Sequence, residues 1–382
     1  MKRISLVSDT IDRGDIDALI GWLQQTPIPR LTKGDLTREL EARWADMVGT
    51  KYSVFVNSGS SAILLLLASY KEYLGGSLRI VVPALSWATD VSSPMLLGYD
   101  IKLCDCNFTD LSCERNELQN IFEQYDPDIF LSVSPLGLIP DMDSIRKLCD
   151  KHRVILIEDN CESMGSHIGG KMLGSYGEAS VFSMYYGHHL STIEGGFINT
   201  SDDVLYNMLL SMRSHGWDRE WDEKIRKEKR EIYGIDDFNA LYTFYLPGFN
   251  VRATDLQAFI GLRQLDKLER YAKRRNYNFH YYKHNIKKNI LALRERGFIS
   301  NFAYPVAISQ REDIVKELQE KGVEVRPIIA GSMGKQPFWI RKHGNKRYAN
   351  AELIHEFGFY LPNHPDLKEE EMDYIIDIIN KY

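Results

Sequence analysis

Long apolar runs, a signal segment and abundant cysteine are all missing from this chain of 382 residues. No stretch approaches the roughly 18 consecutive apolar residues that a membrane-spanning helix needs. Met1, Lys2 and Arg3 are followed by no apolar core of the kind that secretory signals carry. Five cysteines are too few for a disulfide scaffold in a chain of this length. We therefore expect a soluble, cytoplasmic protein with no membrane partner.

Three of the cysteines, Cys104, Cys106 and Cys113, lie close together and raise the question of a metal site. Their spacings, C-x-C and C-x6-C, match no strong zinc or iron–sulfur pattern. Free cysteines are often buried as small apolar residues. We expect ordinary thiols near the end of a strand, and no metal.

The chain also lacks a basic block. It has 47 Lys and Arg against 53 Asp and Glu, a formal net charge of −6, which makes nucleic acid a poor candidate for a partner. The segment 224–231 mixes both signs, as a solvated helix face does. We expect residues 218–240 to form a surface excursion or mobile loop.

Apolar segments typical of strands alternate with helical segments along most of the chain. The expected strands are residues 52–56, 78–82, 101–104, 128–133, 154–157, 179–183 and 197–200. This alternation predicts an α/β fold with a mixed, mainly parallel sheet. Later strands at 302–306 and 323–327, with helices at 311–321 and from 368, predict a small C-terminal α+β domain. We expect a large domain over residues 1–250 and a small one over 251–382.

A turn of small residues, Asn57 to Ala62, joins the first strand to an apolar helix. Backbone N–H groups and hydroxyls at the start of a helix suit a phosphate, and Gly59, Ser60 and Ser61 stand at that start. The same residues also suit an ordinary helix cap made by Ser58 or Ser60. The turn alone leaves both interpretations open.

Two further segments follow strand ends, where ligands bind in open parallel sheets. Trp87 follows the strand that ends at Pro83, and Glu158, Asp159 and Asn160 follow the near-continuous apolar strand 154–157. Trp87 suits stacking on a flat ring, or simply burial in the core. Asp159 suits a helix cap, or a cation held at the end of a buried strand, since buried carboxylates need partners.

The segment from Ser183 to Gly196 places a hydroxyl and two adjacent histidines before a Glu-Gly-Gly turn. Histidine has an ordinary pKa of about 6.5 and often serves as an acid or base near neutral pH. Neighbouring side chains of an extended segment point in opposite directions. We therefore expect only His188 to face a site, with His189 packed behind it.

Taken together, these segments resemble the sugar aminotransferase family of pyridoxal-phosphate enzymes that act on nucleotide-linked keto sugars. The resemblance runs from about Thr32 to Pro365. The segments that carry it are residues 57–62, 157–159, 183–196, 213–216, 248–258 and 360–362. It implies the fold of the aspartate aminotransferase class and a homodimer with active sites at its interface.

The resemblance also implies roles for single residues. Asp159 would face the ring nitrogen of pyridoxal 5'-phosphate, Trp87 would stack on the ring, and Glu162 would lie near the ring hydroxyl. Further residues expected at the cofactor, mostly at its phosphate, are Gly59, Ser60, Ser61, Ser183, Asn250 and Arg252, with Asn250 reaching across the dimer interface. His215, beside Gly216, would contact the substrate and is expected with His188 among the catalytic residues.

One departure from the family pattern bears directly on function. Family aminotransferases read Ser-Phe-x-x-x-Lys, and that lysine holds the cofactor as an imine. This chain reads SMYYGH over residues 183–188, and it has no lysine between Lys171 and Lys224. Because histidine forms no stable imine, the resemblance narrows to the 3-dehydratases that make 3,6-dideoxysugars. They use free pyridoxamine 5'-phosphate, with a histidine as base.

That subgroup implies loss of the C3 hydroxyl from a 4-keto-6-deoxy sugar, release of ammonia, and L-glutamate as the co-substrate that restores the amine. The expected nucleotide sugar is GDP-4-keto-6-deoxy-D-mannose. No cysteine follows Cys161, which favours the branch without an iron–sulfur cluster. Two alternatives stay open: an amino-sugar transaminase with an unusual base or a lysine supplied elsewhere, and a non-catalytic cofactor-binding regulator.

Overall fold

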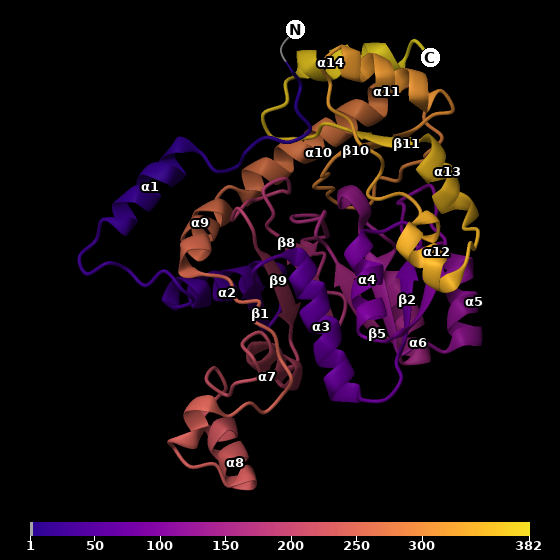
Figure 1. The fold of residues 1–382 in the computed structure, drawn as a ribbon. Helices are drawn as coiled ribbons and strands as arrows, with labels where there is room; N and C mark the ends of the chain where they lie inside the picture. Colours follow the sequence, from indigo (N-terminus) through magenta and orange to yellow (C-terminus); the bar gives the residue numbers. More distant parts are fainter. Residues whose placement is uncertain (1–2) are drawn as a thin grey trace.

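A seven-stranded sheet lies at the centre of the protein, which is described over residues 3–382 in a computed structural model (Figure 1). Its strands lie in the order β1-β9-β8-β5-β4-β2-β3. Their bounds are β1 (Tyr52–Val56), β2 (Arg79–Pro83), β3 (Asp100–Cys104), β4 (Ile129–Val133), β5 (Ile155–Asp159), β8 (Ala179–Ser183) and β9 (Gly196–Thr200). Strands β3, β2, β4, β5 and β8 pair in parallel, whereas β9 runs antiparallel to both β8 and β1. The predicted mixed, mainly parallel sheet is confirmed.

The register of the sheet brings several strand ends to one edge. Val133 pairs with Asp159, and Asp159 pairs with Val181, so β4, β5 and β8 end side by side. Gly196 at the start of β9 pairs with Ser183 on one side and with Val56 on the other. The turns that follow β1, β5 and β8 are therefore neighbours in space, although they are far apart in sequence.

Helices pack in groups around this sheet. One group is α3 (Gly59–Leu74), α4 (Ala88–Leu96) and α7 (Asp203–Met212), in which α3 contacts the other two. A second group is α5 (Arg115–Tyr125) and α6 (Met142–His152). The sheet is apolar because it is covered: every residue of β4, β8 and β9 is buried. Cys104, Cys106 and Cys113 are buried free thiols, as predicted.

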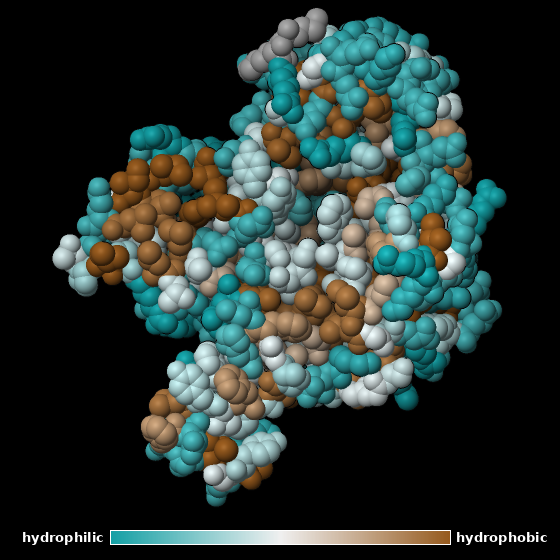
Figure 2. All heavy atoms as spheres, viewed as in Figure 1, coloured by the Kyte–Doolittle hydropathy of each residue, from teal (hydrophilic) through white to brown (hydrophobic). Residues whose placement is uncertain are grey.

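Two helices precede the sheet, α1 (Arg13–Leu23) and α2 (Asp35–Val48), and α1 lies apart from the sheet (Figure 1). The buried Asp15 carboxylate anchors α1 by accepting hydrogen bonds from Arg263 and Lys267, at 2.9 Å and 2.5 Å. Figure 2 shows apolar residues gathered on the surface over α1, at the left of the view. Among residues 3–382, no helix is long and apolar enough to cross a membrane.

The charged excursion that the sequence predicted projects from the body of the protein (Figure 1). It contains α8 (Glu223–Tyr233), with Asp222 as its cap, and the short 3-10 helix η2 (Asn239–Tyr242). All residues of α8 are at least partly exposed, in agreement with a solvated helix face.

The C-terminal part begins with α9 (Asp255–Leu265) and α10 (Leu268–Asn285) and contains a separate antiparallel strand pair, β10 (Tyr304–Ala307) and β11 (Gly358–Leu361). Its other helices are α11 (Arg311–Glu320), η3 (Met333–Lys335), α12 (Pro337–His343), α13 (Ala349–Phe357) and α14 (Glu369–Ile379). The predicted strand at 323–327 is wrong: the segment makes only isolated bridges, from Val323 to Ile4 and from Arg326 to Tyr360. Single pairings of this kind hold a segment in place without forming a ladder. The chain start therefore lies against the C-terminal part.

Candidate active site

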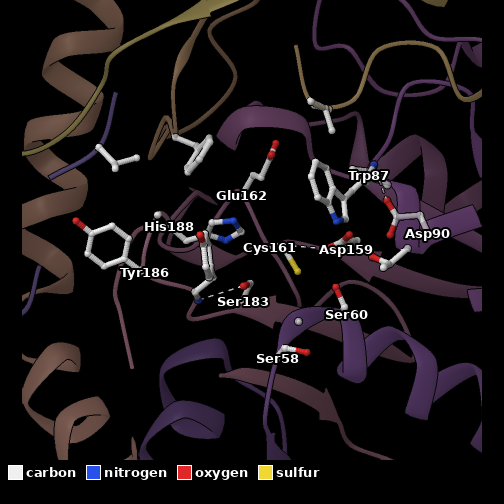
Figure 3. Close-up of a pocket in the computed structure, with 18 of the residues that line it drawn as sticks. Ser58, Ser60, Trp87, Asp90, Asp159, Cys161, Glu162, Ser183, Tyr186 and His188 are labelled. Atoms are coloured by element: carbon white, nitrogen blue, oxygen red, sulfur yellow. Dashed lines mark hydrogen bonds between the residues drawn. The ribbon is translucent and has the colours of Figure 1, made fainter. Parts of the chain in front are cut away.

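A cavity of about 740 Å³ opens at the edge of the sheet where β1, β5 and β8 meet their turns. Figure 3 shows the side chains that converge on it. From the large sheet and its turns, the lining includes Ser58, Gly59, Ser60, Trp87, Asp90, Asp159, Cys161, Glu162, Ser183 and His188. From the C-terminal part, it includes Phe302, Glu324, Arg326 and Tyr360. The large sheet with its turns and the C-terminal part thus line one site.

The turn after β1 brings the first turn of α3 to the cavity. Ser58 caps α3, because its Oγ accepts a hydrogen bond from the Ser61 amide at 3.0 Å. Its hydroxyl also donates to the Ser61 hydroxyl, and Ser61 is not part of the lining. Gly59 and Ser60 do line the cavity. The capping interpretation of the turn is confirmed, and the start of α3 still offers backbone N–H groups to a bound anion.

Gly59 sits where three turns approach closely. A Cβ atom at this position would lie 2.8 Å from Ser183 Cβ and 3.0 Å from Cys161 Sγ. Ser183, at the end of β8, accepts a hydrogen bond from the Tyr185 amide at 3.2 Å, and its hydroxyl lies on the cavity wall. The missing side chain of Gly59 therefore lets the start of α3 meet the ends of β5 and β8.

Asp159 is the last residue of β5 and is almost fully buried. Its Oδ1 accepts a hydrogen bond from the Cys161 amide at 2.9 Å. A second carboxyl group, Asp90 in the first turn of α4, is completely buried against it. Burial, and then the adjacent Asp159 carboxylate, raise the pKa of Asp90 well above its ordinary value. Two adjacent buried carboxylates repel each other, so a state in which the pair holds one proton is favoured.

Sequence reasoning missed Asp90. It stands three residues after Trp87, where an acidic residue commonly caps a helix, and its Oδ2 does accept the Trp87 amide at 3.1 Å. That local role hides its contact with Asp159, which lies 69 positions later in the chain. Trp87 itself lines the cavity and is 53% exposed, so its ring is free to meet a ligand.

Glu162 lies three residues after Asp159, in the turn that follows β5, and lines the cavity (Figure 3). Burial raises the pKa of Glu162 to about 7, and the nearby Asp159 carboxylate acts in the same direction. The Leu136 amide donates to Glu162 Oε2 at 2.9 Å and acts in the opposite direction. Glu162 is thus a carboxyl group poised to hold or release a proton near neutral pH.

His188 lies in a tight loop after β8. Its amide donates to the Tyr185 carbonyl at 2.9 Å, and its ring packs edge-on against Tyr185 and Phe302, with centroids 5.8 Å and 5.3 Å away. Burial lowers the pKa of His188 to about 4, a backbone hydrogen bond with Cys161 raises it, and the Arg275 cation lowers it further. This pKa lies below the ordinary histidine value of about 6.5, and burial is the largest cause. The side chain is therefore neutral at neutral pH and available as a base.

His189 points away from the cavity. Its Nε2 lies 2.8 Å from the Ser300 carbonyl oxygen, and the residue is almost fully buried. This agrees with the expected opposite orientation of the two neighbouring histidines.

Three predicted site residues, His215, Asn250 and Arg252, form a second group outside the cavity lining. His215 has a left-handed backbone, with φ of 65°, and its ring packs against Trp217 at 5.0 Å. Arg252 donates to the Ser214 hydroxyl at 3.2 Å, Ser214 pairs with Asn250, and Asn250 is exposed. Arg252 also bridges to Val56, so this group adjoins the turn after β1.

Comparisons with known proteins agree over nearly the whole chain. The model of the DegT/DnrJ/EryC1/StrS aminotransferase family matches residues 15–380. A GDP-4-keto-6-deoxy-D-mannose 3-dehydratase of Yersinia pseudotuberculosis is 31% identical over 100% of this chain and 99% of its own length. A GDP-4-keto-6-deoxy-D-mannose 3-dehydratase of Escherichia coli O55:H7 is 33% identical over 91% of this chain and 92% of its own length. A crystal structure of GDP-4-keto-6-deoxymannose-3-dehydratase with a trapped PLP-glutamate geminal diamine matches with a TM-score of 0.90 and 31% identity, covering 98% of this chain and 100% of that one.

Proposed function

Because the chain belongs to the DegT/DnrJ/EryC1/StrS aminotransferase family, we propose that it is a pyridoxal-phosphate-dependent sugar 3-dehydratase. Its substrate is a nucleotide-linked 4-keto-6-deoxy sugar, and the relatives named for GDP-4-keto-6-deoxy-D-mannose support that compound. The C3 hydroxyl is lost and ammonia is released. L-glutamate serves as co-substrate and leaves as its 2-oxo acid.

The observation that carries this proposal is the side chain found after β8. Within the described residues, the cavity lining contains a histidine at position 188 and no lysine. A lysine supplied from elsewhere in the chain is therefore not part of the site as it stands. A cofactor bound here would be free of a covalent bond to the protein, and a neutral imidazole would stand beside it.

The residues present fit pyridoxal phosphate. Within residues 3–382, the buried Asp90 and Asp159 carboxyls accept backbone amides and lie beside the Cys161 thiol, and neither forms an ion pair with a lysine or arginine. A protonated ring nitrogen would therefore supply the missing cation. Asp159 would hold that nitrogen, Trp87 would cover a ring face, and Glu162 would lie near the ring hydroxyl. Gly59, Ser60 and Ser183 would hold the phosphate at the start of α3. When bound, the group supplies an amine and an electron sink.

His188 has the properties that the proton transfers require. Its neutral imidazole takes a proton on a free ring nitrogen and later returns one to the departing C3 hydroxyl of the sugar. Phe302 and Tyr185 cover the ring and limit the access of water to it. Histidine cannot replace lysine in an imine, and no lysine lines the cavity among residues 3–382. The site as described therefore has no side chain that would tether the cofactor as in an ordinary transaminase.

The cofactor spectrum in the purified protein tests this proposal. The aldehyde form is expected to bleach on addition of L-glutamate and to return on addition of the keto sugar, with ammonia released. A spectrum that shows an imine to the protein, fixed by borohydride, would instead indicate a transaminase with a lysine. A spectrum unchanged by glutamate and by a broad panel of keto sugars would indicate a regulator. The variant His188→Lys should create the imine band and stop ammonia release.

A homodimer with shared sites is part of the proposal. The second group, His215, Asn250 and Arg252, lies outside the cavity lining of its own chain, which supports a role at the cavity of a partner subunit. Surface apolar side chains suited to an interface are Ile16, Ile20, Ile28 and Leu31 near α1, and Phe238, Leu241, Tyr242 and Phe244 in the excursion (Figure 2). We place Asn250 at a phosphate in the partner subunit.

Two further parts of the proposal concern organisation and place. The division into a large domain, 1–250, and a small domain, 251–382, is supported by the separate β10–β11 pair, although the chain start pairs with Val323 of the small domain. A cytoplasmic location is supported by five free thiols, which are typical of a reducing compartment.

A further inference from the structure

Asp90 is a buried acid that the proposed chemistry does not use. It is completely buried in the first turn of α4 and lines the same cavity as Asp159. One oxygen, Oδ2, accepts the Trp87 amide at 3.1 Å. The other, Oδ1, is buried without a hydrogen-bond partner among the described residues, and the Asp159 carboxyl is an immediate neighbour of this side chain. A buried polar atom of this kind requires an explanation.

The position of Asp90 links two residues that would contact the bound ring. Trp87 would cover the ring face, and Asp159 would hold the ring nitrogen. Asp90 accepts a hydrogen bond from the backbone amide of the first and lies beside the carboxyl of the second. Figure 3 shows Trp87, Asp90 and Asp159 together on one side of the cavity.

The ionisable groups around Asp90 are acidic. They are Asp159, Cys161 and Glu162, all at or just after the end of β5. Within residues 3–382, no lysine or arginine forms an ion pair with Asp90 or Asp159. Two negative carboxylates in contact without a cation are costly in a buried site, whereas a single proton between them converts repulsion into a hydrogen bond.

We infer that Asp90 is a positioning residue for Asp159: it keeps its proton, donates a hydrogen bond from it to the Asp159 carboxylate, and so holds that carboxylate toward the ring nitrogen of the bound cofactor. The inference rests on the proposed function for the identity of the cofactor. Asp159 then carries the one negative charge that the ring nitrogen needs. Asp90 fixes its direction without competing for the ring.

Four proteins test the inference: wild type, Asp90→Asn, Asp90→Ala and Ser93→Ala. Asparagine keeps the shape of aspartic acid and can donate from its amide to Asp159. Alanine removes the donor. Ser93 is a buried residue one turn further along α4 that is absent from the cavity lining, so its variant is a matched control for helix damage. The probe is pyridoxal 5'-phosphate titrated into cofactor-free protein, with melting temperature as the measure of folding.

Because a hydrogen bond to a charged group is lost only in the alanine variant, the dissociation constant should rise about 10- to 100-fold for Asp90→Ala and stay within about threefold for the other two. Equal losses in Asp90→Asn and Asp90→Ala would overturn the inference, since charge rather than donation would then matter. Unchanged affinity in Asp90→Ala would overturn it as well. If Asp90→Ala does not fold, the asparagine variant is compared with wild type alone. A rise of more than about threefold in its dissociation constant would then overturn the inference.

A second readout needs no cofactor. Infrared difference spectra of the cofactor-free proteins at mildly alkaline pH should show a carboxylic-acid carbonyl band in wild type that Asp90→Asn lacks. The absence of that band in wild type would overturn the inference. If wild type binds no pyridoxal phosphate, the proposed function fails. The carboxylic-acid band still shows, independently of that result, whether Asp90 holds the proton.

Discussion

The imidazole of His188 meets the ring of Phe302 edge-on, with 5.3 Å between the ring centroids. His188 follows the central sheet, whereas Phe302 comes from the C-terminal part, two residues before β10. The contact therefore joins the central sheet to the C-terminal part at the site. It also contributes to the burial that lowers the pKa of His188 to about 4.

Removing this cover should move the pH profile. In Phe302→Ala, water reaches the imidazole, and the pKa of His188 should rise from about 4 toward its ordinary value. Because the neutral imidazole is the active form, kcat/KM for ammonia release should fall between about pH 7 and pH 5 in this variant and stay level in wild type. Phe302→Leu keeps an apolar cover and should resemble wild type. If kcat/KM depended on pH in the same way below pH 7 in all three proteins, this account of His188 would be contradicted.

Gly59 predicts a steric effect. In Gly59→Ala the new Cβ would stand 2.8 Å from Ser183 Cβ, so the turns after β1 and β8 must separate. We expect a loss of about 1–3 kcal/mol in the free energy of unfolding and weaker cofactor binding. Gly21→Ala is the control, because its Cβ would meet nothing within 4 Å in α1. That change should be neutral or slightly stabilising. Denaturant unfolding of both variants measures the difference, and equal stabilities would refute the close approach.

Glu162 predicts how the stability of the cofactor-free protein depends on pH. Its folded-state pKa of about 7 exceeds the ordinary 4.5, so the folded protein binds the proton more tightly than the unfolded chain does. This stabilisation is fully present below about pH 4.5 and is lost as pH rises to about 7, by up to about 3 kcal/mol. Urea unfolding across this window should show the slope in wild type and a flatter curve in Glu162→Gln. Parallel curves would be inconsistent with a raised pKa.

Shared sites predict rescue between subunits. His188→Asn and Asn250→Ala should each be nearly inactive as homodimers. In a mixed dimer, the site of the Asn250→Ala subunit receives an intact Asn250 from its partner and keeps its own His188. Random mixing should therefore restore about a quarter of the wild-type activity, because half of the dimers are mixed and each has one good site. If Asn250 serves its own chain, each mixed dimer has two singly defective sites and nothing is recovered.

Much of the site could be predicted because the end of an apolar strand can be recognised in the sequence. Asp159, Ser183 and the Gly59 turn each end or follow an apolar strand, and a parallel sheet brings such ends to one edge. Phe302 and Arg326 could not be found this way, because their place in the cavity depends on how the C-terminal part packs.

Other features were hidden by local roles or by weak pairing. Asp90 has the spacing of a helix cap, and that interpretation accounts for only one of its oxygens. The segment 323–327 has the apolar pattern of a strand, yet only single bridges fix it. The family resemblance implied that Asn250 and Arg252 lie at the cofactor and that His215 contacts the substrate. In the fold of a single chain, these three residues lie beside the turn after β1 but outside the cavity of that chain.

The identity of the product is the most direct test of the central claim, that His188 and an untethered cofactor remove a hydroxyl. Wild-type protein is supplied with pyridoxal phosphate, L-glutamate and GDP-4-keto-6-deoxy-D-mannose, and the sugar and ammonia are quantified by mass spectrometry and a coupled assay. We predict a 3-deoxy-4-keto sugar with one ammonia per sugar, formed about 10²- to 10⁴-fold more slowly by His188→Asn. A 4-amino sugar that keeps its C3 hydroxyl, formed without ammonia, would contradict the account.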